Sequence, residues 1–212
     1  NYFIKFMNIL AIESSSTVCG TALFINNNLV EIDEINQPRI HGERLPLVVH
    51  EVLSNHSISV TDLDGIAVSS GPGSYTGLRI GMSLAKGLAM AGSIPIIPAP
   101  TLEVMNKGIS QKGSYYILLH SHKNMVFVQQ FNSGIPDSEI ECVPFDADEY
   151  YPRFGFNMNS ICKPDDYGLA PMSAKFVGEL AIQNYDKWAN INLSEVIPNY
   201  VSNFNIGKVK EN

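Results

Sequence analysis

The sequence predicts an α/β fold in which mixed β-sheets carry helices on their faces. Three observations support this fold class: an opening run of strand-like segments, helical segments that alternate with short apolar strands, and a length of 212 residues with 45% hydrophobic content, which suffices to bury a sizeable core. The opening strands are expected at residues 7–12, 19–25 and 29–35, and Asn26-Asn27-Asn28 between the last two is typical of a hairpin turn.

The next segments alternate between helix and strand. A helix is expected at residues 42–55, because apolar side chains recur there every three or four positions. An apolar strand at residues 65–69 leads through a glycine-rich loop into a second helix at residues 75–91, and a strand follows at residues 94–97. Three antiparallel strands followed by right-handed crossovers give the ribonuclease-H-like arrangement.

The second half of the chain repeats this order in a reduced form. Pro95, Pro98 and Pro100 mark a boundary between the halves. We therefore expect two ribonuclease-H-like subdomains with mixed sheets, residues 7–100 and residues 101–205, of which the second is degenerate. Its strands are expected at residues 115–119, 125–131, 139–143 and 160–162, with a short helix at residues 146–151 and a longer one at residues 174–185.

Composition and charge exclude two classes of function. The net charge is -7, from 21 acidic and 14 basic residues, and the basic residues are scattered, whereas direct nucleic-acid binding needs a cluster of them. No run approaches the roughly 18 apolar residues of a membrane span, so no membrane association is expected. Cys19, Cys142 and Cys162 form no metal-binding or disulfide pattern, which favours the reducing cytoplasm. Met7 is expected to be the native first residue.

The second predicted helix is unusually rich in glycine. Each of Gly77, Gly81 and Gly87 costs about 1 kcal/mol relative to alanine inside a helix. Gly77, Gly81, Ala85 and Ala89 recur at i+4 spacing, so they lie on one face, where a second helix can approach closely. The spacing therefore predicts a helix-helix contact with a partner.

A candidate cofactor-binding site lies where two of the predicted strands end. Glu13 and Ser14 follow the first strand, and Gly71, Gly73 and Ser74 lead into the second helix, whose N-terminus attracts anions. The loop lacks the Gly-Lys-Ser/Thr ending of a Walker motif. Two interpretations stay open: a nucleotide contact, or a polar turn with a hydroxyl side chain as helix N-cap.

Four motifs of the first half occur together. They are Asn8-Ile9-Leu10-Ala11-Ile12-Glu13-Ser14-Ser15, His41-Gly42-Glu43-Arg44-Leu45-Pro46-Leu47, Asp62-Leu63-Asp64-Gly65-Ile66-Ala67-Val68 and the run from Gly71 to Gly81. Together they resemble the TsaB (YeaZ) family over residues 7–102. The resemblance implies a degenerate actin-like, Hsp70-like ATPase fold. It also implies a noncatalytic accessory protein for threonylcarbamoyl transfer from threonylcarbamoyl-adenylate to adenosine 37 of ANN-decoding tRNAs.

The resemblance implies partners as well. A heterodimer with the catalytic subunit TsaD is expected, joined by the ATPase TsaE, so that tRNA is contacted only indirectly. TsaD carries a His-x-x-x-His metal pair, but Thr101 and Met105 occupy the comparable positions here and cannot replace two imidazoles. We therefore expect no catalytic residue, no metal and no intrinsic cofactor. An ATP or ADP at the joint with the partner stays open. His120 and His122 stand where the family usually has an Asp-Ala-Arg-Arg-like turn.

The partner interface is expected on the two helices of the first half, where Gly81→Leu should block the heterodimer and leave the monomer folded. Two alternatives stay open: a free-standing ATPase, sugar kinase or peptidase of actin-like fold that uses Glu13 and the glycine loop, and a homodimer through the same helix face. The expected interface residues are His41, Arg44, Leu45, Val49, Gly77, Leu78, Gly81, Met82, Ala85 and Ala89.

Overall fold

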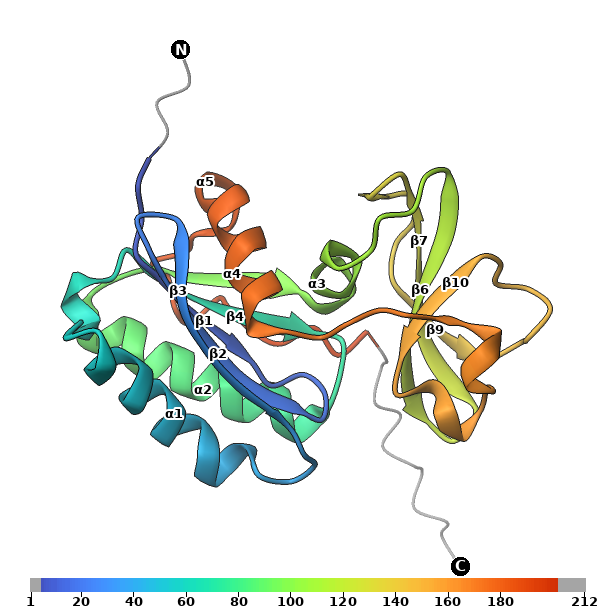
Figure 1. Cartoon of the computed structure of the whole chain (residues 1–212), viewed down its shortest axis with the longest axis horizontal. Helices are drawn as coiled ribbons and strands as arrows, with labels where there is room; N and C mark the ends of the chain where they lie inside the picture. Colours follow the sequence, from blue (N-terminus) through green and yellow to red (C-terminus); the bar gives the residue numbers. More distant parts are fainter. Residues whose placement is uncertain (1–4, 202–212) are drawn as a thin grey trace, which may run out of the picture.

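The computed structural model describes residues 5–201, which form two β-sheets side by side (Figure 1). In the first sheet β1 pairs antiparallel with β2 and parallel with β4, which confirms the predicted ribonuclease-H-like topology. Its strands lie in the order β3-β2-β1-β4-β5 and comprise β1 (Ile9–Glu13), β2 (Val18–Ile25), β3 (Asn28–Asn36), β4 (Gly65–Gly71) and β5 (Ile96–Pro100).

Helices cover both faces of the first sheet. Because side chains alternate along a strand, Leu10 and Ile12 of β1 pack against α1 (His41–Asn55) and α2 (Tyr75–Gly92) on one face. Ile9 and Ala11 pack on the opposite face, against α4 (Ala174–Gln183). Figure 1 shows this three-layer arrangement, with α1 and α2 below the sheet and α4 above it. The short helices η1 (Val60–Asp62) and α5 (Tyr185–Trp188) lie at its periphery.

The second sheet has the same strand order with fewer helices. β6 pairs antiparallel with β7 and parallel with β10, as β1 pairs with β2 and β4. Between β10 and β11 the chain forms only two short 3-10 helices, η2 (Met158–Ser160) and η3 (Pro164–Asp166), which confirms a degenerate second copy. The strands are β6 (Ser114–His122), β7 (Met125–Asn132), β8 (Ile135–Pro136), β9 (Glu141–Pro144), β10 (Arg153–Phe156) and β11 (Gly168–Leu169).

The segments on either side of β10 differ from the prediction. Residues 146–151 form no helix, and residues 160–162 lie at and just after the end of η2 rather than in a strand. The cause is Arg153, which is 4% exposed and donates hydrogen bonds from three nitrogens. Its acceptors are the Ala147 and Asp166 carbonyls, at 2.6 and 2.9 Å, and the Tyr151 hydroxyl at 2.8 Å. These bonds hold the segment as a loop wrapped around a buried guanidinium.

Helix α4 follows the second sheet in the chain but packs on the first. Glu34 of β3 accepts hydrogen bonds from the Ser173 hydroxyl at 2.9 Å and from the Ala174 N–H at 3.0 Å, and so caps the start of α4. Gly178 lies so close to Phe24 that an added Cβ would collide with the ring. The division into residues 7–100 and 101–205 stays a prediction, and its last residues, 202–205, lie outside the described residues.

The two chain crossings between the halves touch each other. α3 (Thr101–Lys107) leads into the first crossing, and Pro171 belongs to the second, which runs from β11 to α4. Gly108 of the first crossing lies against the Pro171 ring, which occupies the space that a Cβ on Gly108 would take. Within residues 5–201, no helix is long and apolar enough to cross a bilayer.

Candidate functional site

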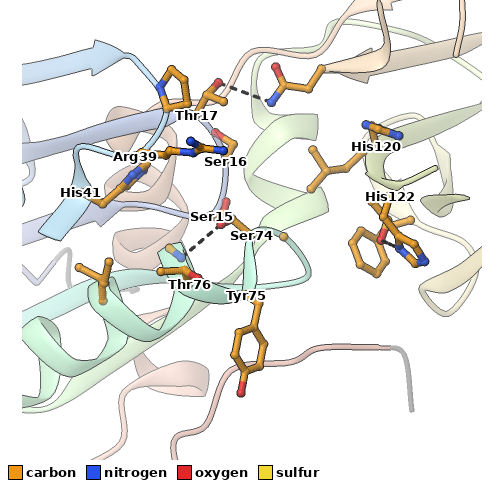
Figure 2. A pocket seen from close by; sticks show the side chains of 18 of the residues that line it. Ser15, Ser16, Thr17, Arg39, His41, Ser74, Tyr75, Thr76, His120 and His122 are labelled. Carbon is orange, nitrogen blue, oxygen red and sulfur yellow. Dashed lines mark hydrogen bonds between the residues drawn. The ribbon is translucent and has the colours of Figure 1, made fainter. Parts of the chain in front are cut away.

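A cavity of about 960 Å³ opens between the two sheets (Figure 2). The loop between β1 and β2 and the segment that leads into α1 form one side, with Ser16, Arg39 and His41. The N-terminus of α2 forms the floor, and the hairpin of β6 and β7 forms the opposite side with His120 and His122. The site thus lies where two sheets of the same topology face each other.

Glu13 at the end of β1 is fully buried and already has hydrogen-bond partners on both oxygens. Its Oε1 accepts from the Ser15 N–H and from the Ser15 hydroxyl, each at 2.7 Å, and its Oε2 accepts from the Ser69 hydroxyl. Burial raises the pKa of Glu13 to about 6, and the three donors only partly oppose this shift. Glu13 therefore organises the loop behind the cavity wall and does not line the cavity.

The other predicted cofactor-binding residues divide into two groups. Gly73 and Ser74 line the cavity, whereas Ser14 and Gly71 do not. Ser14 is fully buried, and its hydroxyl has no hydrogen-bond partner among the described residues. Gly71 has φ +106°, and a Cβ there would collide with the Asn199 carbonyl, so the glycine serves the packing of the chain itself.

The N-terminus of α2 is held against the first loop. Ser74 is the N-cap, because its hydroxyl accepts from the Gly77 N–H at 3.2 Å, and its own N–H donates to the Ser15 carbonyl at 2.7 Å. The first turn of α2 contains no acidic residue. The helix therefore presents its positive end to the cavity.

Two of the three histidines that line the cavity are held by backbone carbonyls. His41 is 6% exposed, and its Nε2 donates to the Val18 carbonyl at 3.0 Å, since a carbonyl only accepts. The Nε2 of His120 donates to the Lys123 carbonyl at 3.0 Å in the same way. No three His, Cys, Asp or Glu side chains of residues 5–201 gather in an arrangement that could hold a metal ion.

Thr101 and Met105, which stand in place of a metal-binding histidine pair in the sequence comparison, are both fully buried. Met105 is fully buried in the core of the second sheet, as expected for an apolar core residue. Thr101 is the first residue of α3 rather than its cap, and its hydroxyl accepts from the Gly71 N–H at 3.1 Å. Both positions therefore have structural contacts inside the chain.

The predicted partner interface is wrong in its residues. All of its members except Arg44 are buried within the chain: His41, Leu45, Val49, Gly77, Leu78, Gly81, Met82, Ala85 and Ala89. The glycine-alanine face of α2 is turned inward, where a Cβ on Gly77 would collide with the Ser14 carbonyl and one on Gly81 with the Ser14 hydroxyl. Gly81→Leu would therefore disrupt the monomer itself. Arg44 lies at the surface and pairs with Asp33 at 3.0 Å and Glu51 at 3.5 Å.

The sequence interpretation missed the opposite, outward side of these helices. Leu47 of α1 is 54% exposed and Met90 of α2 is 72% exposed. Gly87 is exposed too, and a Cβ there would meet no atom within 4 Å. The sequence does contain a signal for this surface, because its apolar residues lie outside the inward face that the helical periodicity predicts. We call this surface the outer helix face; it comprises Leu47, Ile80, Leu84, Gly87, Leu88 and Met90.

Three comparisons with known proteins agree with one another. A family model described as "TsaD: tRNA N6-adenosine threonylcarbamoyltransferase" matches residues 34–132. A Haemophilus influenzae protein named tRNA threonylcarbamoyladenosine biosynthesis protein TsaB is 32% identical over 162 residues, which cover 75% of this chain and 65% of the relative. Its Escherichia coli namesake is 38% identical over 106 residues, 50% of this chain and 46% of the relative.

A solved structure extends the similarity of fold over most of the molecule. It is an uncharacterized Pseudomonas aeruginosa protein described as similar to the peptidase YEAZ. It matches with a TM-score of 0.74 at 20% identity, over 92% of this chain and 100% of that structure. The chain spans less than two thirds of the length of the curated relatives it matches.

Proposed function

We propose that the chain, which is 32–38% identical to proteins named TsaB over the matched residues, is a member of the TsaB (YeaZ) family and serves as a noncatalytic subunit in the formation of threonylcarbamoyladenosine in tRNA. In this role it binds a TsaD-type catalytic subunit, works in the cytoplasm and contacts tRNA and a TsaE-type ATPase only within the complex. The names of its relatives support the pathway. An exposed apolar surface supports the binding of a partner.

The outer helix face is the observation that carries the proposal. Leu47 of α1 and Met90 of α2 expose about half or more of their surface, and Ile80, Leu84 and Leu88 of α2 are partly buried and pack against the core. Exposed large apolar side chains on the two helices are of the kind that a protein-protein contact covers. The partner thus meets the side of α1 and α2 that points away from the sheet.

Gly87 supplies an independent reason. Inside a helix a glycine costs about 1 kcal/mol relative to alanine, and nothing in this chain occupies the space of a Cβ at position 87. Gly77 differs, because the Ser14 carbonyl leaves no room for a side chain there. The close approach of a partner helix explains a glycine that the monomer does not need.

The noncatalytic role rests on two structural contacts. Glu13 is fully buried, does not line the cavity and accepts hydrogen bonds from the chain on both oxygens, which argues against its holding a magnesium ion as it would in a free-standing ATPase or kinase. Met105 lies in the core at the place of a metal-binding histidine of TsaD. The reacting groups are therefore assigned to the partner.

The test is co-purification with the TsaD subunit of the same organism, followed by threonylcarbamoyl transfer to tRNA measured by mass spectrometry of nucleosides. Met90→Glu places a carboxylate in the contact at an exposed position and leaves the monomer folded. We expect complex formation and transfer to fall at least tenfold. The matched control is Ile135→Glu, at a residue of the second sheet that is 70% exposed, which should change neither.

The outcome decides between the alternatives. If Met90→Glu forms the complex as the unchanged chain does, the outer helix face is not the interface. ATP turnover by the isolated chain would favour the free-standing enzyme. Self-association without TsaD is followed by light scattering at rising concentration, and its loss in Met90→Glu would show that a homodimer and the heterodimer share one surface.

A further inference from the structure

We propose that residues 196–201 form a detachable strap, which fixes the start of α2 and ties the first sheet to the second while it is bound, and which releases both when it detaches. The inference concerns the chain alone and does not depend on the proposed function. It rests on the packing at the two ends of the strap, on a backbone hydrogen bond and a ring contact between them, and on the backbone conformation of its last residue.

The strap runs from the core of one sheet to the core of the other. Val196 is 5% exposed and packs with the residues of α1 and α2 that cover the first sheet. Val201, at the other end of the strap, packs against the core of the second sheet. The bound strap therefore adds a further connection between the sheets to the two chain crossings.

The middle of the strap holds the loop that leads into α2. The Asn199 N–H donates to the Ser70 carbonyl at 2.7 Å. The Asn199 carbonyl lies where a Cβ on Gly71 would be, so only a glycine at this position leaves room for the strap. Ser70 and Gly71 end β4, and α2 begins at Tyr75. The strap thus fixes the chain just before the helix.

Tyr200 of the strap contacts the first residue of α2. The ring centroids of Tyr75 and Tyr200 lie 4.9 Å apart, which is within the usual range for aromatic pairs. Figure 2 shows the ring of Tyr75 extending from the start of α2 toward this part of the chain. Both tyrosines line the cavity between the sheets. Detachment of the strap would therefore change the start of α2 and one wall of the cavity together.

Val201 has a backbone conformation that opposes the binding of the strap. Its φ is +55°, in the left-handed region, where a β-branched residue is an outlier. Two contacts keep it there: its N–H donates to Asn199 Oδ1 at 3.1 Å, and its side chain packs on the second sheet. Strain of this kind persists only where the surroundings enforce it. The bound and detached states are therefore closer in free energy than the contacts alone would make them.

The experiment measures amide hydrogen exchange of the full chain by NMR, with each rate corrected for the intrinsic rate of that amide. If the strap detaches by itself, the Asn199 amide should exchange roughly tenfold or more faster than the Val68 amide of β4. Low concentrations of urea should leave the Asn199 rate unchanged, because a local opening exposes little surface.

Tyr200→Ala tests the ring contact. Without the ring, the exchange rate of the Asn199 amide should rise roughly fivefold or more, while that of Val68 should stay the same. The Leu78 amide, which donates to the Ser74 carbonyl at 2.8 Å, reports on the first turn of α2 and should exchange faster as well. The matched control is Ile197→Ala, at a strap residue that is 71% exposed, which should change none of these rates.

Two substitutions of Val201 test the strain. Val201→Ala and Val201→Gly both remove the packing of the side chain, but glycine adopts a φ of +55° without a steric cost and alanine does not. We expect the Asn199 amide to exchange roughly threefold or more slowly in Val201→Gly than in Val201→Ala.

Four results would overturn the inference. Equal exchange of the Asn199 and Val68 amides would show that the strap opens only with the whole molecule. Faster exchange of Val68 in Tyr200→Ala would show a general loss of stability. Unchanged exchange of Leu78 in that variant would separate the strap from α2. Equal exchange of Asn199 in the two Val201 variants would show that no strain favours release.

Discussion

Among single residues, the carboxyl group of Glu13 shows how a position can be predicted while its role is not. The sequence places it at the end of the first strand, which is correct. Its contact with Ser69 joins residues 56 positions apart in the chain, and only the parallel pairing of β1 with β4 brings them together. The local sequence contains no signal for this contact. It therefore could not show whether the Glu13 carboxylate binds magnesium or accepts hydrogen bonds from the chain itself.

The first prediction concerns the pH dependence of stability. The pKa of Glu13 in the folded chain is about 6, above its ordinary value of 4.5, so the folded state holds the proton more tightly than the unfolded state. The stabilisation is complete below pH 4.5 and is lost as the pH rises through 6, by about 2 kcal/mol. Urea unfolding at several pH values should show this fall in the free energy of unfolding, and Glu13→Gln should lack it. Equal slopes for both proteins would contradict the assignment.

The second prediction compares two substitutions of Glu13 at pH 7. Glu13→Gln keeps an acceptor for Ser15 and can donate to the Ser69 hydroxyl, so it should unfold at the same or a higher urea concentration. Glu13→Ala leaves buried donors without acceptors and a small void, which should cost about 3 kcal/mol. If Glu13→Ala were as stable as Glu13→Gln, the hydrogen bonds would have no part in holding the loop.

For the secondary-structure elements, helix α2 shows where periodicity stops being informative. The expected range, residues 75–91, agrees closely with the observed Tyr75–Gly92. Spacing at i+4 shows that Gly77 and Gly81 share a face, but not whether that face points to a partner or to the chain itself. The backbone around Ser14 decides the question, and its position depends on the whole sheet.

The third prediction separates the two kinds of glycine in α2. Gly87→Ala should raise the stability of the monomer by about 0.5–1 kcal/mol, because the new methyl group meets empty space and the helix gains propensity. Gly77→Ala should lower it by about 1–3 kcal/mol, because the methyl group meets the Ser14 carbonyl. Thermal unfolding of the monomers measures both. A destabilised Gly87→Ala protein would show that the monomer itself needs this glycine.

In the molecule as a whole, the repeated order of strands could be predicted from the sequence. The sheet on which the last long helix packs could not. The amphipathic pattern at residues 174–185 predicts a helix with one apolar face, which suits either sheet equally well. The structure places α4 on the first sheet, where Glu34 caps it and Phe24 packs against Gly178. The loop around Arg153 was missed for a related reason, because its acceptors lie on both sides of it in the chain.

The fourth prediction follows from this interlocking. A fragment of residues 1–100 lacks α4, so Ile9, Ala11 and Phe24 lose the helix that covers them. We expect the fragment to unfold without a cooperative transition and to bind a hydrophobic dye, whereas the full chain should melt in one transition by calorimetry. A fragment with a sharp transition of its own would show that the first sheet is complete without α4.

The contact between Gly108 and Pro171 has a mechanical consequence. Helix α3 lies just before this contact and packs on both sides: Leu102 and Met105 lie in the core of the second sheet, and Val104 lies in the core under α4. A methyl group at position 108 must push the Pro171 ring aside, and Pro171 lies three residues before α4. A substitution at a loop glycine should therefore disturb the packing of a helix that lies more than sixty residues further along the chain.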